Sequence, residues 1–358
     1  MTAAHLIATQ EPLPPPDALA PRWQALEARA EGAFFTTWTW IGSWLRATGA
    51  RPDLVGVRDN EGAEIGLALF GLGREARRLG RQRTLRLNEA GVPDADRMFI
   101  EYNAPLARAG REHDVAAAIA ALLGRRRDWR VLRLSGVEED CALVGLVPAR
   151  RRILVDVMPA HAASLAQVRG AGGDYLALLS GNTRSQIRRA LRDHGDGATA
   201  VDRAGDAGTV ENWLGEMRRL NDGRHEDNAW DAPLFRAFAR EIALAGLADG
   251  TVDLLRVTVG GDVTGYLLNF VHSDRAMNYQ SAFAPPVGPK DKPGLVTHMA
   301  AVCHYAARDD LALYSLLAGR DRYKESLATG RELLQWWQIE RFSPGLEAEY
   351  WLRKLLGR

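Results

Sequence analysis

The chain has 358 residues, of which 46% are hydrophobic and 25% charged, and this profile predicts a soluble globular protein of about two domains. Its 46 Lys and Arg side chains are balanced by 45 Asp and Glu, which argues against a constitutive DNA- or RNA-binding protein. Two cysteines are too few for a disulfide framework or a four-ligand structural zinc site.

The first 21 residues are rich in proline and read as an extended lead-in. They lack the basic segment and apolar core of a secretory signal, and the chain has no run of about 20 apolar residues that could span a membrane. The sequence therefore predicts a cytoplasmic protein without a membrane span.

Strands and helices alternate along the first half. A short helix is expected at residues 22–29, followed by the aromatic run FFTTWTWIGSWL at 34–45, which turns into a second helix. Alternating segments at 53–57 and 64–72, separated by the turn sequence DNEG, predict a hairpin. Two more strands (83–87 and 130–134) flank an Ala-rich helix (113–123).

The second half has a similar order. Helices are expected at 182–192, 209–220 and 233–247, and three successive strands at 251–259, 262–272 and 276–284. A Pro/Gly loop, PPVGPKDKPG, leads into a helix at 295–308. The remaining segments predict a strand at 312–316, a short helix at 322–328, a strand at 332–341 and a last helix at 345–356.

Two hairpin sequences resemble each other across the halves. DLVGVRDNEGAEIGLALF begins at Asp53, and DLLRVTVGGDVTGYLLNF begins at Asp253. A chance match stays open; otherwise the chain contains two copies of one α/β (α+β) unit. The expected division is a lead-in at 1–21, a first unit at 22–155 and a second at 156–358.

The Pro/Gly loop is the strongest candidate for an anion site. A loop that ends in Gly294 and opens a helix exposes backbone N–H groups at the positive end of the helix dipole. Thr297 could add a hydroxyl donor, and Lys290 and Lys292, two of only four lysines, lie just upstream. A solvated turn is the alternative. The nucleotide motifs GxxxxGK[ST] and strand-GxGxxG-helix are absent.

The order of strands, loop and helix resembles the GNAT acyltransferase superfamily, and within it the tandem-GNAT branch of BioF2-like or CelD-like acetyltransferases and Fem-type aminoacyl transferases. The resemblance rests on FFTTWTWIGSWL, LLSGNTRSQIRRALR, YQSAFAPP, KPGLVTHMA and GRDRYKESL, which extend over nearly the whole chain. It implies two tandem GNAT-like units, each with a mixed, mostly antiparallel sheet flanked by helices.

The resemblance also implies that an acyl-coenzyme A, acetyl or longer, binds the second unit, while the first is degenerate and shapes the acceptor cleft. No metal is implied. The pyrophosphate would lie at the helix start and the pantetheine beside the preceding strand. The residues so implied are Tyr279, Ser281, Ala282, Phe283, Lys290, Lys292, Gly294, Leu295, Val296, Thr297 and His298.

The sequence departs from the family pattern in two places. The strand after the phosphate helix commonly carries an acidic residue, whereas this chain has Tyr314 and Ser315 there. An aromatic residue often follows the Tyr-Lys pair, whereas Ser326 and Leu327 stand here. Both departures concern the catalytic assignment.

Transfer of an acyl group to an amine needs a destination for the amine proton and a donor for the leaving thiolate. Tyr323 could protonate the thiolate and Lys324 could hold a carboxylate or phosphate, although a packed Tyr ring and a solvated Lys are equally open. Asp321 could orient the amine or accept its proton, or simply be a helix N-cap.

Further candidates line the expected acceptor side. Gln280 lies on the strand that would border the acyl channel. In the stretch NDGRHEDNAW, His225 or Glu226 could serve as a base in the acceptor site, or the segment could be a solvated loop. Adjacent residues cannot all point at one ion, so a metal site is not expected there.

The expected function is an acyl-coenzyme A-dependent N-acyltransferase acting on a small-molecule, sugar or peptide amine, as a monomer or homodimer. One alternative is an aminoacyl-tRNA-dependent Fem-type transferase, for which Arg184, Arg188 and Arg192 would form a basic helix face. In this Arg-rich chain a solvated face is the first interpretation of the same residues. The other is a catalytically inactive partner protein that kept the fold.

Overall fold

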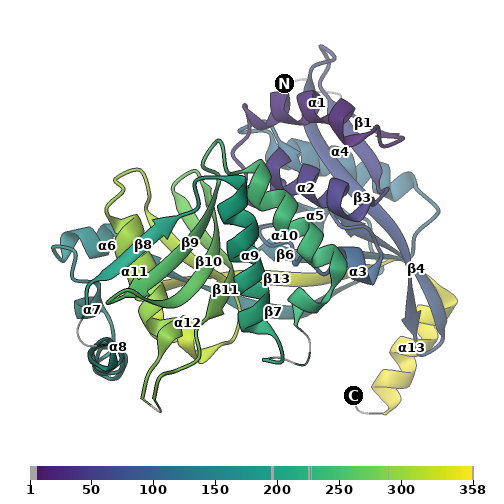
Figure 1. Ribbon diagram of the computed structural model, residues 1–358. Helices are drawn as coiled ribbons and strands as arrows, with labels where there is room; N and C mark the ends of the chain where they lie inside the picture. The colour runs from purple at the N-terminus through teal and green to yellow at the C-terminus, as the bar shows by residue number, and fades with distance from the viewer. Residues whose placement is uncertain (1–5, 195–196, 225, 227, 289, 357–358) are drawn as a thin grey trace. The chain divides into compact units, whose positions relative to one another are not determined.

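A computed structural model describes residues 6–194, 197–224, 226, 228–288 and 290–356. The chain folds into two compact units (Figure 1). The first comprises Met1–Val157 together with Leu334–Arg358, and the second comprises Met158–Leu333. The chain therefore passes from the first unit to the second and returns to the first for its last strand and helix.

The first unit is built on a mixed sheet with the strand order β1-β2-β3-β4-β6-β13. Strands β1 to β4 are antiparallel neighbours, β4 and β6 are parallel, β6 and β13 are antiparallel, and the short β5 pairs with β3. The strands are β1 (Ile7–Glu11), β2 (Asp53–Arg58), β3 (Glu64–Arg77), β4 (Gly80–Leu87), β5 (Leu106–Ala107), β6 (Val131–Glu138) and β13 (Gly330–Glu340).

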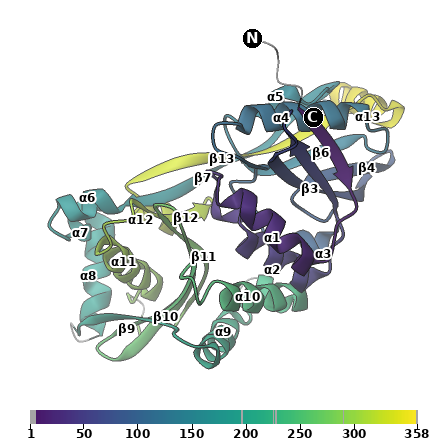
Figure 2. The ribbon, with the colours of Figure 1, turned by 90° about the horizontal axis from the view of Figure 1, so that it is seen from above.

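Helices lie against both faces of this sheet (Figure 2). The apolar stripe Val115, Ile119 and Leu123 of α4 is buried among the strands, as its spacing requires. Thr37 caps α2 by accepting the N–H of Trp40. The helices are α1 (Pro16–Glu27), α2 (Trp38–Thr48), α3 (Pro93–Asp96), α4 (Glu112–Arg125), α5 (Ala142–Leu146) and α13 (Pro344–Leu355), with a 3₁₀ turn at Phe34–Thr36.

The second unit has the strand order β7-β12-β11-β10-β9-β8. Neighbours are antiparallel except for β11 and β12, which are parallel. The strands are β7 (Arg151–Ser164, whose second half belongs to this unit), β8 (Thr199–Arg203), β9 (Val252–Val259), β10 (Asp262–His272), β11 (Arg275–Phe283) and β12 (Leu313–Ala318).

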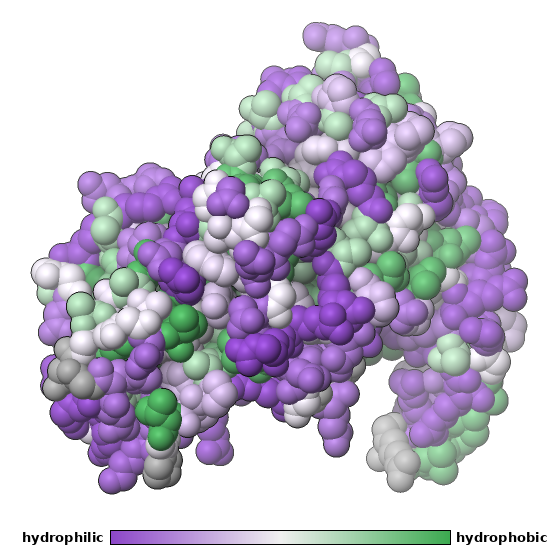
Figure 3. Space-filling view, viewed as in Figure 1, coloured by the Kyte–Doolittle hydropathy of each residue, from purple (hydrophilic) through white to green (hydrophobic). Residues whose placement is uncertain are grey.

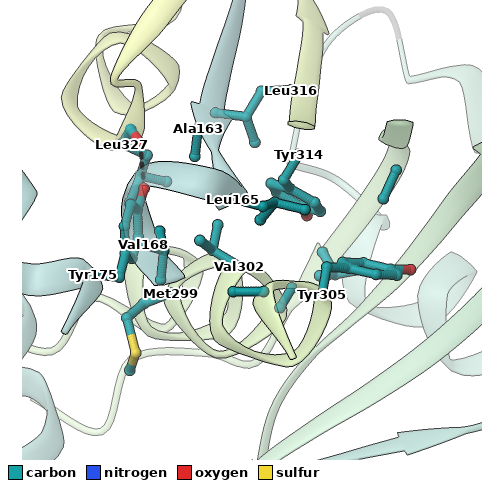
Figure 4. Close-up of a cluster of buried hydrophobic side chains, with 14 of the residues drawn as sticks. Ala163, Leu165, Val168, Tyr175, Met299, Val302, Tyr305, Tyr314, Leu316 and Leu327 are labelled. Carbon is teal, nitrogen blue, oxygen red and sulfur yellow. Dashed lines mark hydrogen bonds between the residues drawn. The ribbon is translucent and has the colours of Figure 1, made fainter. Parts of the chain in front are cut away.

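Helices of the second unit also form two layers, with α11 on one face and α9 and α10 on the other (Figure 2). On the α11 side, the core includes the stacked rings of Tyr305 and Tyr314, 5.7 Å apart, and Tyr175, whose hydroxyl donates to the C=O of Leu327 (Figure 4). The helices are α6 (Leu165–Gly170), α7 (Tyr175–Leu178), α8 (Gly181–Asp193), α9 (Ala207–Asn221), α10 (Pro233–Ala245), α11 (Pro293–Ala306) and α12 (Arg322–Leu327), with a 3₁₀ turn at Ala229–Asp231.

The two units share one topology. Each has four sequential antiparallel strands, a crossover that contains a helix, a parallel strand and a final antiparallel strand. The two hairpins that resemble each other in sequence are β2–β3 and β9–β10, which occupy equivalent places in the two sheets. The expected α/β architecture of two similar units, each with a mixed, mostly antiparallel sheet flanked by helices, is confirmed.

Two details differ from expectation. The lead-in at 1–21 contains β1, which pairs with β2, and the first turns of α1, because Pro16 starts a helix where an N–H is not needed. Residues 334–358, expected in the second unit, complete the first, because β13 pairs with β6.

The last helix leaves apolar side chains on the surface. Figure 3 shows hydrophobic residues gathered over α13, at the lower right of the view. The exposed apolar residues of this segment are Tyr350, Trp351, Leu352, Leu355 and Leu356. Across the described residues, no helix is long and apolar enough to cross a bilayer.

Candidate active site

Strands β11 and β12 of the second unit run parallel but pair only briefly. Their register joins Arg275–Met277 to Leu313–Ser315, although β11 continues to Phe283 and β12 to Ala318. Leu317 has the left-handed angle φ 57°, which is rare for a branched side chain and interrupts β12 where it leaves its partner. The ladder with β12 therefore ends at Met277, and beyond it the C=O groups of Gln280 and Ser281 accept from Asn278 Nδ2 at 3.2 Å and Asn221 Nδ2 at 3.1 Å.

Helix α11 begins shortly beyond the end of β11. Its first residue, Pro293, has no N–H, and the N–H groups of Leu295 and Val296 both donate to the C=O of Lys292, at 3.0 and 3.2 Å. The Gly294 N–H has no partner among the described residues. This donor lies at the positive end of a 14-residue helix, and Lys290 and Lys292 are exposed just before it.

The side chains of the first turns of α11 point inward. Leu295 and Val296 are in the apolar core, and the Thr297 hydroxyl donates to the Thr264 hydroxyl on β10 at 3.0 Å. Thr297 is fully buried, so its hydroxyl is not directed at the loop. A Cβ at Gly294 would lie 3.1 Å from the Phe283 ring, so the helix start packs closely on the end of β11.

Asp291 organises the loop between β11 and α11, and the sequence pattern gave no sign of it. Its side chain is buried, and Oδ2 accepts the Val287 N–H at 2.9 Å. Oδ1 lies 3.5 Å from Nε2 of His194, at the end of α8. The carboxylate thus faces the interior, while the two lysines of the loop face solvent.

The other candidates on β11 have different surroundings. Tyr279 is half-buried and stacks on Phe270 at 4.8 Å. The Ser281 hydroxyl donates to Asn278 Oδ1 at 2.8 Å, Gln280 is half-buried, and Ala282 is buried. The Phe283 ring lies edge-on to His298, 5.6 Å away.

Three sequence candidates come together where β12 ends and α12 begins. The Tyr323 ring stacks on the His298 ring, with centroids 5.7 Å apart and an interplanar angle of 19°. Lys324 Nζ donates to the C=O of Ala318 at 2.8 Å. Asp321 occupies the N-cap position of α12, but its side chain makes no capping hydrogen bond.

His298 lies at the centre of this group and is fully buried. Its Nδ1 is 3.0 Å from the Tyr314 hydroxyl, and its Nε2 is buried without a partner among the described residues. Burial, aided by the nearby positive charge of Lys324, lowers the pKa of His298 to about 3. Burial raises the pKa of the Tyr323 hydroxyl, and the negative charge of Asp321 raises it further. The imidazole is therefore neutral and the phenol protonated near pH 7.

The acceptor candidates lie elsewhere in the second unit. His225 falls outside the described residues, and Glu226 is exposed in the loop after α9. On α8, Arg188 and Arg192 are exposed and Arg184 is half-buried. Within the described ranges, no three His, Cys, Asp or Glu side chains are arranged to hold a metal ion.

A comparison with protein families matches the part of the second unit that holds the candidate site. Residues 181–325 match the family model of an acetyltransferase (GNAT) domain, which includes β8 to β12 and α11. No curated protein matches the sequence. The family match at 181–325 therefore includes the loop before α11, α11 itself and Tyr323.

Solved structures resemble nearly the whole chain at low sequence identity. The FemX structure covers 95% of this chain and 98% of its own, with a TM-score of 0.58 and 10% identity. L-PGS from Bacillus licheniformis covers 94% of this chain and 97% of its own, with a TM-score of 0.55 and 9% identity. The C-terminal domain of a putative lysylphosphatidylglycerol synthetase from Agrobacterium fabrum covers 94% and 95%, with a TM-score of 0.53 and 10% identity.

These likenesses show the fold. The family match covers residues 181–325 of the second unit, and the first unit has the same strand order. The chain is therefore built of two tandem units of GNAT-like fold, and residues 181–325 of the second match an acetyltransferase (GNAT) domain.

Proposed function

We propose that the second unit binds an acyl-coenzyme A, acetyl or longer, and transfers its acyl group to an amine. The observation that carries the proposal is the parting of β11 from β12 beside the Gly294 N–H. The part of β11 beyond Met277, where its ladder with β12 ends, suits an extended pantetheine arm. The start of α11 suits the pyrophosphate, with Lys290 and Lys292 adding positive charge.

The reaction requires few groups from the protein. The neutral amine nitrogen bonds to the thioester carbonyl carbon, the C–S bond breaks, and the amine loses one proton while the thiolate gains one. Tyr323 is the proposed donor of the second proton: its hydroxyl is protonated near neutral pH, and the negative charge of a thiolate beside it supplies the acceptor that its raised pKa requires. Asp321, exposed at the N-cap of α12, is the proposed acceptor of the amine proton, and Lys324 supplies positive charge beside it.

Calorimetric titration with acetyl-coenzyme A tests the donor. Gly294→Asp places a carboxylate at the proposed phosphate site and should abolish binding, and Lys292→Ala should weaken it several-fold. Lys354→Ala, on α13 of the first unit, is the matched control. Unchanged binding in Gly294→Asp would refute the donor site.

Turnover separates binding from chemistry. With a panel of amines, Tyr323→Phe should retain acetyl-coenzyme A binding but lower kcat by about 10²–10⁴-fold, the range for losing a general acid. A normal kcat in Tyr323→Phe would show that another group protonates the leaving thiolate.

An aminoacyl-tRNA-dependent transfer is the second candidate, and the likeness to FemX over nearly the whole chain favours it. The exposed Arg188 and Arg192 on α8 could contact phosphates. This alternative predicts tRNA binding that weakens steeply with salt and with Arg188→Ala. Tight coenzyme A binding without tRNA retention would reject it, and loss of both would favour an inactive partner protein.

A further inference from the structure

A chain of buried polar side chains crosses the second unit and ends at His298. It begins at Asp253 on β9, whose buried carboxylate forms an ion pair with Arg203. A carboxylate can only accept hydrogen bonds. The Tyr305 hydroxyl, 3.0 Å from Asp253 Oδ2, therefore donates its single proton to it.

This first bond fixes the orientation of Asn269. Because the Tyr305 proton is already used, its oxygen accepts from Asn269 Nδ2 at 3.1 Å. Asn269 Oδ1 accepts from Asn278 at 2.8 Å, which agrees with the same orientation of the amide. The rings of Tyr305 and Tyr314 stack with their centroids 5.7 Å apart, which places this group next to Tyr314.

The orientation of Tyr314 then determines the tautomer of His298. Among the described residues, the fully buried Tyr314 hydroxyl has one hydrogen-bond partner, His298 Nδ1 at 3.0 Å, so its proton is directed at that nitrogen. A neutral imidazole that accepts at Nδ1 carries its hydrogen on Nε2. This Nε2–H donor is buried, and the described residues offer it no acceptor.

A buried donor without an acceptor is rare in folded proteins and points to a missing partner. The imidazole lies between the stacked ring of Tyr323 and the edge-on ring of Phe283, the last residue of β11. The missing acceptor therefore belongs beside the parted strands, where the proposed acyl donor would lie.

We propose that His298 Nε2–H donates a hydrogen bond to a carbonyl oxygen of the bound acyl donor. This inference rests on the proposed function. The carbonyl belongs either to the thioester or to an amide of the pantetheine arm. No proton is transferred: Tyr314 is the positioning residue that holds the imidazole as a fixed neutral donor, and Tyr305, held by Asp253 and Asn269, stacks on the Tyr314 ring.

Nitrogen-15 NMR of the full-length protein tests the tautomer. The His298 signals are assigned by their loss in His298→Gln, and His304→Gln on the same helix is the matched control. We expect a neutral ring protonated at Nε2 in the wild-type protein and a mixture of tautomers in Tyr314→Phe. A hydrogen on Nδ1 in the wild-type protein would overturn the inference.

Titration with coenzyme A and acetyl-coenzyme A then identifies the acceptor. A shift of the Nε2–H signal with acetyl-coenzyme A alone supports the thioester carbonyl, and a shift with both ligands supports a pantetheine amide. Calorimetry on the same samples separates the failures. Binding without any shift overturns the inference and leaves the proposed function standing, whereas absence of binding refutes the function and the ligand assignment together.

Kinetics provide a second measurement that does not depend on the NMR signals. Gln can still present an N–H near the position of Nε2, whereas Leu cannot. We expect kcat to fall at least ten-fold more in His298→Leu than in His298→Gln, with both variants giving the wild-type circular dichroism spectrum. Equal losses in the two folded variants would contradict a role for the donor.

Discussion

At the scale of single residues, the burial of His298 links stability to pH. Its folded pKa of about 3 lies below the value of 6.5 for an ordinary histidine, so the unfolded chain binds more protons between these pH values. Stability is present above pH 6.5 and is lost as the pH falls toward 3. The slope is about 1.4 kcal/mol per pH unit.

We therefore expect His298→Gln to lose less stability than the wild-type protein between pH 7 and pH 4.5. Urea unfolding at both pH values measures the difference, which should be about 3 kcal/mol. His113→Gln, at an exposed position, is the control and should follow the wild-type slope. Parallel slopes for His298→Gln and the wild-type protein would contradict the burial of the imidazole.

Glu89 in the first unit has the opposite dependence. Burial, aided by the charge of Asp96, raises the pKa of Glu89 to about 7, and the Ser135 hydroxyl donates to it at 2.8 Å. The stability this group contributes is complete below its ordinary pKa of 4.5 and is lost as the pH rises through 7. Ionisation thus destabilises the folded state above neutrality.

The permanently neutral variant Glu89→Gln should be more stable than the wild-type protein at pH 8.5, by up to about 3 kcal/mol, and should gain nothing at pH 4.5. Chemical denaturation at the two pH values checks this, with exposed Glu139→Gln as the control. A gain of equal size at both pH values would show that ionisation is not its cause.

The sequence could place some of these residues but not their contacts. The position of Gly294 and Lys292 at the start of a helix was predictable, because a glycine between a loop and an apolar run is a local signal of a helix boundary. The pairing of His298 with Tyr314 joins two elements and has no local signal. Thr297 is an example. From the sequence, a hydroxyl at a helix start is a candidate ligand donor, but in the structure it donates to the Thr264 hydroxyl.

At the scale of elements, the predicted hairpins and amphipathic helices are confirmed within a few residues, because alternation and helical spacing report burial directly. Four strands were missed. β7 contains Pro159 and ends in small residues, β8 is mostly exposed at a sheet edge, β1 lies in a proline-rich segment, and β5 has only two residues. Each lacks the apolar alternation that identifies a half-buried strand.

The loop between β11 and α11 depends on Asp291. Removing this side chain in Asp291→Ala deletes the hydrogen bond between the carboxylate and the Val287 N–H, and a hydrogen bond to a charged group contributes about 1.5–3 kcal/mol. We expect faster hydrogen exchange over 284–292 and weaker acetyl-coenzyme A binding, with little change in the first unit. Asp309→Ala, near the other end of α11, is the matched control. Unchanged exchange in the loop of Asp291→Ala would contradict its role.

At the scale of the whole molecule, the two units have the same strand order but obtain their last strand differently. The second unit is continuous in sequence, and its β7 precedes all its other strands. The first unit takes β13 from the end of the chain, so β6 pairs with a strand that follows it by about 190 residues. The sequence suggested the repeat but not the return of β13 to the first unit, because the pattern of a strand does not show which other strand it pairs with.

The two units should therefore differ when expressed separately. A fragment of residues 158–333 contains every strand of its sheet except the first half of β7, and we expect it to unfold cooperatively and to bind acetyl-coenzyme A. A fragment of residues 1–157 lacks β13, which leaves the edge of β6 and the apolar side chains beneath it uncovered. It should aggregate or melt without a cooperative transition, and covalent addition of residues 334–358 through a linker should restore folding. Circular dichroism melting of the three proteins checks this, and a cooperative transition in residues 1–157 alone would show that β13 is dispensable to the first unit.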